Sequence, residues 1–176
     1  MSGHNKWSKI KHRKEATDTK KSKIFGMHAK KIAFESRQSG GDIESPGLRN
    51  ALTKARADNM PNENIERAIK KGSGSDAIAF EEVRYETYGP GGVALIIEGI
   101  TDNKNRTTAE IKHIFSKRGM DLAATGAALW AFTKTNDEWV ANQTTPISEA
   151  DGEKLGDLID LLDEHEDVKN VYTNAE

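Results

Sequence analysis

The cations that surround Trp7 form the stretch of this sequence best suited to binding chemistry. The first fifteen residues, MSGHNKWSKIKHRKE, combine five lysines and arginines with one tryptophan and a single acid, Glu15. Cationic side chains beside an aromatic ring suit a polyanion with stackable bases, such as nucleic acid. Only Trp7 and Ile10 could pack, so this segment cannot bury enough apolar surface to fold by itself. A solvated chain terminus is the competing interpretation.

The net charge of the chain conceals a division between its two parts. The whole chain of 176 residues has a formal net charge of −2. Residues 1–75 contain 17 lysines and arginines against 8 aspartates and glutamates, a net charge of +9, whereas residues 76–176 contain 9 against 20, a net charge of −11. This asymmetry predicts two bodies with different partners. The basic body would attract phosphate groups, and the acidic body would repel them. This difference could fix how the protein is oriented on a phosphate-bearing partner.

Helical periodicity predicts three short amphipathic helices in the basic part. The first follows a cap at residue 17 or 18 and ends at Gly40-Gly41. The second opens at Ser45-Pro46, and the third extends from a cap at Asn62 to Gly72. Together they predict a small three-helix bundle behind the basic arm.

A helix-turn-helix is the alternative reading of the second and third helices, because residues 59–62 resemble its turn. The third helix, however, begins with Glu63, Asn64 and Glu66, which places acids where base contacts are expected. Binding dominated by the phosphate backbone fits the lysines better.

The acidic part, residues 80–176, predicts one α+β domain after a linker at 73–80. Its pattern of strands and helices favours a ferredoxin-like α+β sandwich with a mainly antiparallel sheet. The predicted strands are 83–88, 93–100, 127–134 and 168–172, and the predicted helices follow Asn105 and Ser148.

One loop of the acidic part carries a second candidate binding site. Residues 101–107 place two cations among small polar residues at a helix N-terminus, where free N–H groups already favour anions. Helix capping explains Asp102 or Thr107 alone, but it does not explain the pair of cations. The sequence therefore predicts a phosphate or partner contact at Lys104, Asn105, Arg106 and Thr107.

No catalytic constellation is evident, so neither an enzyme nor a metal or other cofactor is expected. The histidines at 4, 12, 28, 113 and 165 lack close metal-ligand spacing, and the chain has no cysteine. No apolar run approaches the ~20 residues of a membrane span, and the N-terminus lacks the apolar run of a signal peptide. We expect a cytoplasmic protein without a membrane partner. The candidate nucleic-acid-binding residues are His4, Lys6, Trp7, Lys9, Lys11, His12, Arg13, Lys14, Lys20, Lys21, Lys23, Lys30, Lys31, Arg49, Lys54 and Arg56.

Several long motifs give the chain a family resemblance. It resembles the YebC/PmpR family of probable transcriptional regulatory proteins, which also includes the mitochondrial translational activator of cytochrome oxidase. The matching motifs are GHNKWSKIKHRK (3–14), SKIF (22–25), LRNALTKARADNMPNENIERAIKKGSG (48–74), YETYGPGGVALIIEGITDNKNRT (85–107) and DVKNVYTNAE (167–176).

The resemblance implies a helical N-terminal domain followed by two α+β domains, without enzymatic activity. Members of the family are described as DNA-binding transcriptional regulators, and others resemble ribosome-associated translation factors. This sequence departs from the family pattern between about 134 and 147, where members carry an inserted domain. We expect a short form that lacks that domain.

The residues and the resemblance together predict a non-enzymatic, nucleic-acid-binding regulator of gene expression. Regulation of transcription through DNA is the leading interpretation. A ribosome-associated factor that binds structured ribosomal RNA and regulates translation is the alternative, because a basic arm suits folded RNA. An adaptor whose acidic part docks a protein and an undetected hydrolase are weaker alternatives. The oligomeric state is not predicted.

Overall fold

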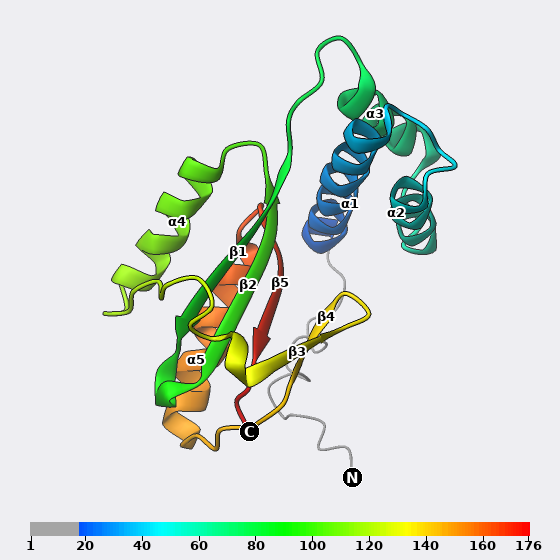
Figure 1. Cartoon of the computed structure of the whole chain (residues 1–176). Helices are drawn as coiled ribbons and strands as arrows, with labels where there is room; N and C mark the ends of the chain where they lie inside the picture. Colours follow the sequence, from blue (N-terminus) through cyan, green and yellow to red (C-terminus); the bar gives the residue numbers. More distant parts are fainter. Residues whose placement is uncertain (1–17) are drawn as a thin grey trace. The chain divides into compact units, whose positions relative to one another are not determined.

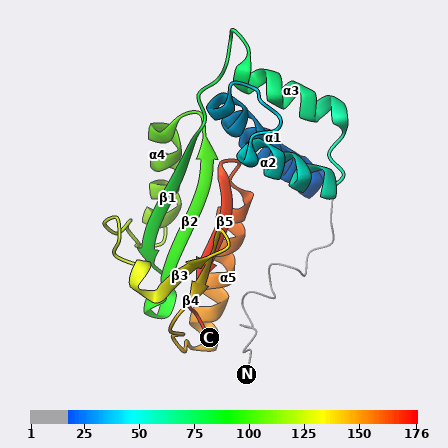
Figure 2. The same ribbon diagram turned by 45° about the vertical axis from the view of Figure 1, so that its right-hand side comes forward.

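A computed structural model describes residues 18–176 and places five α-helices and two β-sheets within them (Figures 1 and 2). By their contacts, residues 18–82 and 100–104 form one unit, here the helical unit. Residues 83–99 and 105–176 form the other, here the α+β unit. The predicted α+β fold is confirmed by this combination of helices and antiparallel strands.

The helical unit contains the three predicted helices, α1 (Asp18–Ser39), α2 (Pro46–Ala57) and α3 (Asn62–Ser73). Their apolar faces meet in a core that includes Ile32, Leu48, Leu52 and Ile65. Helix α1 ends where predicted, because Gly40 and Gly41 adopt φ values of 63° and 85°, which glycine tolerates best. Ile24, which the helical spacing of apolar residues would place on the inner face of α1, is nevertheless 43% exposed.

The sequence suggested that the third helix ends at Gly72, but Gly72 lies inside this helix. Helix α3 continues to Ser73, and Gly72 is buried. A Cβ atom on Gly72 would lie 2.2 Å from the carbonyl oxygen of Ala33 in α1. Glycine at this position therefore allows α1 and α3 to approach closely. The hydroxyl of Ser36 also joins the two helices, since it donates to the Ile69 carbonyl at 2.8 Å.

The predicted caps of the second and third helices differ in detail from the structure. Helix α2 begins after Ser45 as predicted, but the Ser45 hydroxyl makes no capping hydrogen bond. Asn62 is not a cap, because Pro61 occupies that position and Asn62 is the first helical residue. The Pro61 carbonyl accepts the N–H groups of Asn64 and Ile65, which begins the helix without a side-chain cap.

The main sheet of the α+β unit has the strand order β1-β2-β5, with β1 at Glu81–Tyr88, β2 at Ala94–Thr101 and β5 at Val168–Thr173. Strand β2 pairs antiparallel with β5. Helices α4 (Lys104–Ser116) and α5 (Glu149–Glu164) cover one face of this sheet (Figure 1). Leu95 and Ile97 of β2 pack there against Phe115 of α4 and Leu158 of α5.

The predicted strand 127–134 forms in part and lies in a different sheet. Residues Leu129–Ala131 form a 3₁₀ turn, and β3 begins only at Phe132–Thr135. It pairs with β4 (Glu138–Ala141) in a separate two-stranded sheet. Phe132 and Trp139 of this hairpin cluster with Ala94 and Ile96, which alternate along β2 with the residues facing α4 and α5.

Ser148 caps α5 as predicted. Its hydroxyl oxygen accepts the Asp151 N–H at 3.1 Å, and the hydroxyl donates to the Asp151 carboxylate at 2.8 Å. The first of these bonds satisfies a free N–H group of the first turn, and the second fixes the Ser148 side chain in its capping position. Within residues 18–176, no helix combines the length and hydropathy that a bilayer crossing requires.

Candidate nucleic-acid interface

The outer surface of α2 carries only positive charge. Arg49, Lys54 and Arg56 are all exposed, and the twelve residues of this helix include no aspartate or glutamate. Its buried side, Leu48, Ala51, Leu52 and Ala55, turns toward the bundle and so leaves the cations on the solvent side. An exposed cationic helix of this kind can bind phosphate groups without reading base identity.

The candidate lysines of α1 differ in their surroundings. Lys21 is exposed, and Lys20, Lys23 and Lys30 are half-buried and each have an interaction partner. Lys31 is held by two carboxylates, with its Nζ 2.7 Å from Glu35 and 2.8 Å from Glu82. Its charge is therefore already balanced inside the helical unit.

The two carboxylate partners of Lys31 also shift its pKa. Partial burial by itself lowers the pKa, but the hydrogen bonds and negative charges of Glu35 and Glu82 outweigh burial and raise it above the ordinary value of 10.5. Lys31 therefore stays charged and paired, and it is poorly available to bind phosphate. The candidates His4, Lys6, Trp7, Lys9, Lys11, His12, Arg13 and Lys14 lie outside the residues that the structure describes.

The sequence interpretation missed three exposed cations on α3. Arg67, Lys70 and Lys71 stand at positions i, i+3 and i+4, so they share one face of the helix. This spacing was a signal in the sequence, but the acids at the start of the same helix obscured it. Arg67 contacts Glu63 at 3.4 Å and Asn64 at 2.8 Å, and both contacts lie on the surface. Exposed pairs of this kind contribute little to stability and exchange easily with other partners.

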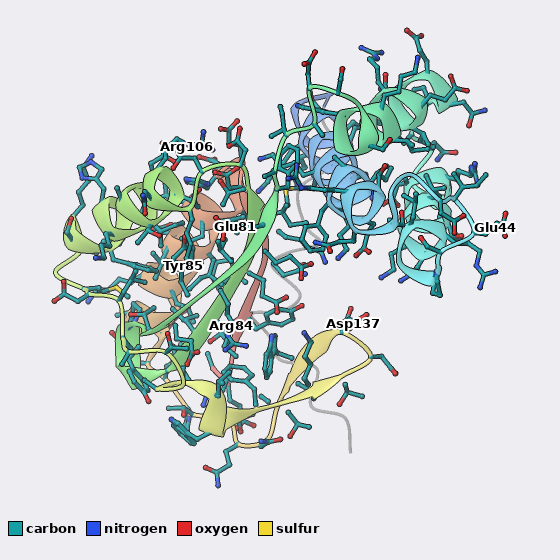
Figure 3. All side chains as sticks on the ribbon, turned by 45° about the horizontal axis from the view of Figure 1, so that its top comes forward. Glu44, Glu81, Arg84, Tyr85, Arg106 and Asp137 are labelled. Atoms are coloured by element: carbon teal, nitrogen blue, oxygen red, sulfur yellow. The ribbon has the colours of Figure 1, made fainter. Side chains whose placement is uncertain are left out.

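Arg106, from the second candidate site, has a structural partner. It lies near the N-terminal end of α4 (Figure 3), and its Nη2 donates to the Asp167 carboxylate at 2.9 Å. The Thr107 hydroxyl donates to the same oxygen at 2.7 Å. Asp167 precedes β5, and its side chain is only 1% exposed. Arg106 and Thr107 therefore serve first to tie α4 to the start of β5, whereas Lys104 and Asn105 are exposed.

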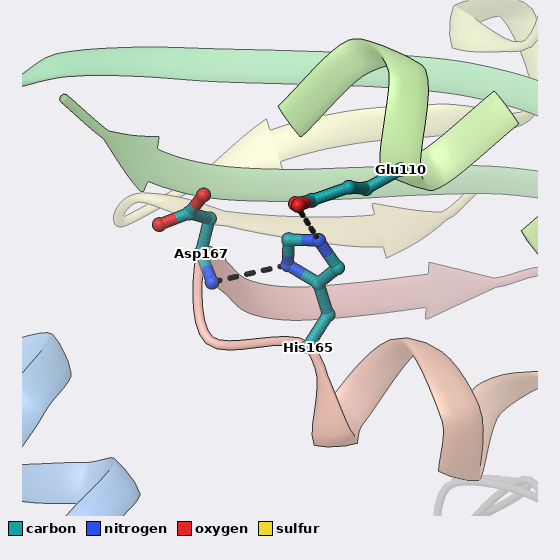
Figure 4. Close-up of side chains that lie close together, drawn as sticks. All are labelled: Glu110, His165 and Asp167. Atoms are coloured by element: carbon teal, nitrogen blue, oxygen red, sulfur yellow. Dashed lines mark hydrogen bonds and ion pairs between the residues drawn. The ribbon is translucent and has the colours of Figure 1, made fainter. Parts of the chain in front are cut away.

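Glu110, His165 and Asp167 offer ligand atoms within 4.8 Å of one another, close enough to hold a metal ion (Figure 4). The His165 Nδ1 accepts the Asp167 N–H at 3.1 Å, so the proton of a neutral ring lies on Nε2, which contacts Glu110 at 2.9 Å. Both ring nitrogens are thus engaged. Arg106 already pairs with the Asp167 carboxylate, which a bound metal ion would need as a ligand. The cluster fits a structural hydrogen-bond network better than a metal centre.

Family comparisons match almost the whole chain. The model of the TACO1/YebC protein N-terminal domain matches residues 5–75. The model of the TACO1/YebC second and third domain matches residues 80–137 and 131–175.

Two curated relatives are 49% and 40% identical to this chain over their aligned residues. A protein of Thermotoga petrophila named "Probable transcriptional regulatory protein" is 49% identical over 164 residues, which is 92% of this chain and 61% of that protein. The chain therefore spans about three fifths of that relative's length. A "Probable transcriptional regulatory protein" of Thermoanaerobacter pseudethanolicus is 40% identical over 239 positions, covering 100% of this chain and 97% of that protein.

A solved structure has the same fold. The crystal structure of a conserved hypothetical protein from Aquifex aeolicus superposes with a TM-score of 0.84 at 31% sequence identity. The superposition covers 97% of this chain and 96% of that one.

Proposed function

This chain belongs to the TACO1/YebC family, and we propose that it is a non-enzymatic regulator of gene expression that works by binding nucleic acid through its helical unit. The names of its curated relatives, probable transcriptional regulatory proteins, support the regulatory role. DNA is the ligand that those names favour.

The observation that carries this proposal is the wholly cationic surface of α2. Arg49, Lys54 and Arg56 are exposed there with no acid on the same helix. Each contact between such a cation and a phosphate releases condensed counterions, and this release drives nucleic-acid binding at moderate salt. The basic arm, with Trp7 among its cations, would extend the same chemistry.

The charges on α3 support binding to the backbone rather than reading of bases. A recognition helix contacts base edges through its N-terminal residues. Here those residues include the exposed acids Glu63 and Glu66, which phosphate and most base edges would repel. We therefore propose binding with low sequence preference, in which phosphate contacts supply most of the affinity.

Equilibrium binding by the full chain tests this proposal. Labelled duplex DNA and a labelled RNA hairpin of equal length are each titrated with the protein over a series of salt concentrations, and the nucleic acid is recovered afterwards. We expect affinity that falls steadily with salt and nucleic acid that is chemically unchanged. Absence of binding to both ligands at low salt, or cleavage of either one, would contradict the proposal.

A further inference from the structure

A groove between α1 and α3 is a feature of the helical unit that phosphate binding by α2 does not use. Its volume is about 650 Å³, within the range of ligand-binding clefts. Its floor is apolar and is formed by Phe25, Ala29, Met60 and Ala68. All of its lining residues belong to the helical unit.

Positive charge dominates the edge of this groove. Arg67, Lys70 and Lys71 line it from α3, and Asp76 is the one acid among its lining residues. The Lys71 ammonium lies 5.5 Å from the centre of the Phe80 ring, and Arg67 makes the surface contacts with Glu63 and Asn64 described above. An occupant that complements these groups has a flat apolar body and negative charge beside it.

Gly26 keeps this groove open at a cost to its own helix. It lies inside α1, where glycine is a poorer helix former than alanine. A Cβ atom on Gly26 would meet no atom within 4 Å, and its φ angle is not positive. Neither close packing nor backbone conformation therefore requires glycine here, in contrast to Gly72. Since Gly26 lines the groove, its small size preserves space for an occupant beside the Phe25 ring.

We propose that this groove binds an unpaired base of single-stranded nucleic acid, with the base on the apolar floor at Phe25 and its flanking phosphates on Arg67, Lys70 and Lys71. Aromatic rings and guanidinium groups stack with any base, and cations along a groove follow the phosphate backbone. An acidic peptide would satisfy the cations, but its carboxylate side chains offer no flat apolar group to pack on the apolar lining residues. This inference rests on the proposed function and adds a preference for unpaired strands.

The test replaces Gly26 with leucine, which fills the groove and retains every charge. The probes are a labelled oligo-dT and a labelled oligo-U of 15 nucleotides each, a duplex DNA of equal length and a poly-glutamate peptide. Gly156→Leu is the matched control, because Gly156 is also a helical glycine with nothing within 4 Å of an added Cβ, but it lies on α5. We expect Gly26→Leu to weaken binding of both oligonucleotides at least about tenfold, the loss expected for one stacked base. Duplex binding should change little, and Gly156→Leu should behave as the wild type.

A second variant keeps the test decisive if Gly26→Leu does not fold. Phe25→Leu retains an apolar floor but removes the stacking face, so it should weaken oligonucleotide binding several-fold while duplex binding is retained. If folded variants bind the oligonucleotides as the wild type does, the inference is overturned and the proposed function stands. If poly-glutamate displaces the oligonucleotides and loses affinity through Gly26→Leu, the groove is a peptide site instead. If the wild type binds no nucleic acid at all, both the proposed function and this inference are overturned.

Discussion

Arg106 and Asp167 form an ion pair of 2.9 Å that joins the start of α4 to the start of β5. The Asp167 side chain is almost completely buried, whereas Arg106 is 37% exposed. Gly99 of β2 contributes to this arrangement, because a Cβ atom there would lie 2.2 Å from the Asp167 carbonyl oxygen. The segment before β5 is therefore held from the helix side by Arg106 and from the sheet side by close contact with Gly99.

Replacing Arg106 with glutamine should destabilise the protein. The change removes the Arg106 guanidinium from a buried carboxylate, which costs about 3 kcal/mol in free energy of unfolding. Lys112→Gln is the control, since Lys112 is an exposed cation of the same helix, and it should change stability by less than about 0.5 kcal/mol. Chemical denaturation measures both variants. If Arg106→Gln leaves stability unchanged but weakens nucleic-acid binding, Arg106 is a phosphate contact rather than a structural cation.

Replacing Gly72 with alanine should separate α1 from α3. The added methyl group meets a backbone carbonyl that cannot move aside without shifting the helix, so we expect a loss of about 3 kcal/mol. Gly26→Ala is the matched control, because the space beside Gly26 is open and alanine should stabilise α1 by about 0.5–1 kcal/mol. Thermal denaturation gives the sign of each change. Equal effects of the two substitutions would refute the close approach of the helices.

Tyr172 should ionise only near pH 12. Burial raises its pKa to about 12, and the negative charges of Glu98 and Glu138 act in the same direction. Because the pKa in the folded protein exceeds the ordinary value of 10, the contribution to stability is complete below pH 10 and is lost as the pH rises through 12. Ultraviolet absorbance of the phenolate follows the titration. Tyr172→Phe should remove the step near pH 12, and persistence of that step in the variant would assign it to another group.

Replacing Trp7 with alanine tests the arm, which lies outside the described residues. If the indole stacks on a base, binding should weaken by about 1–3 kcal/mol while the melting temperature stays the same. The loss should be greater for folded RNA than for duplex DNA, because folded RNA offers unstacked bases. A lower melting temperature with unchanged affinity would instead show that Trp7 packs against the protein.

Local signals in the sequence predicted the elements well. The cap at Ser148 and the glycines at 40 and 41 act within a few residues of themselves, and both predictions are confirmed. The helix faces also followed from periodicity, although Ile24 at the start of α1 is exposed.

Long-range partners explain what the sequence could not predict. The sequence interpretation placed a helix end at Gly72, because the sequence alone does not reveal the close approach of Gly72 to Ala33. The sequence interpretation treated Lys31 as an available cation, because its partner Glu82 lies 51 residues away in the sequence. The Glu86 carboxylate is buried, and it accepts the N–H groups of Gly126 and Ala128, which lie about 40 residues away in the sequence. Each of these residues is determined by a chain segment that only the fold brings near.

The salt dependence of binding by an α2 variant tests the central claim most directly. The variant Arg49→Gln/Lys54→Gln/Arg56→Gln removes the three exposed cations of α2, and Lys112→Gln/Lys117→Gln/Lys169→Gln removes three exposed cations of the α+β unit as a charge-matched control. Affinity for duplex DNA is measured over a series of salt concentrations. If the α2 cations contact phosphate, the slope of log affinity against log salt should be shallower by about 2.7 in the α2 variant and unchanged in the control. The same slope in the wild type and both variants, or an equal change in the control, would contradict binding through the helical unit.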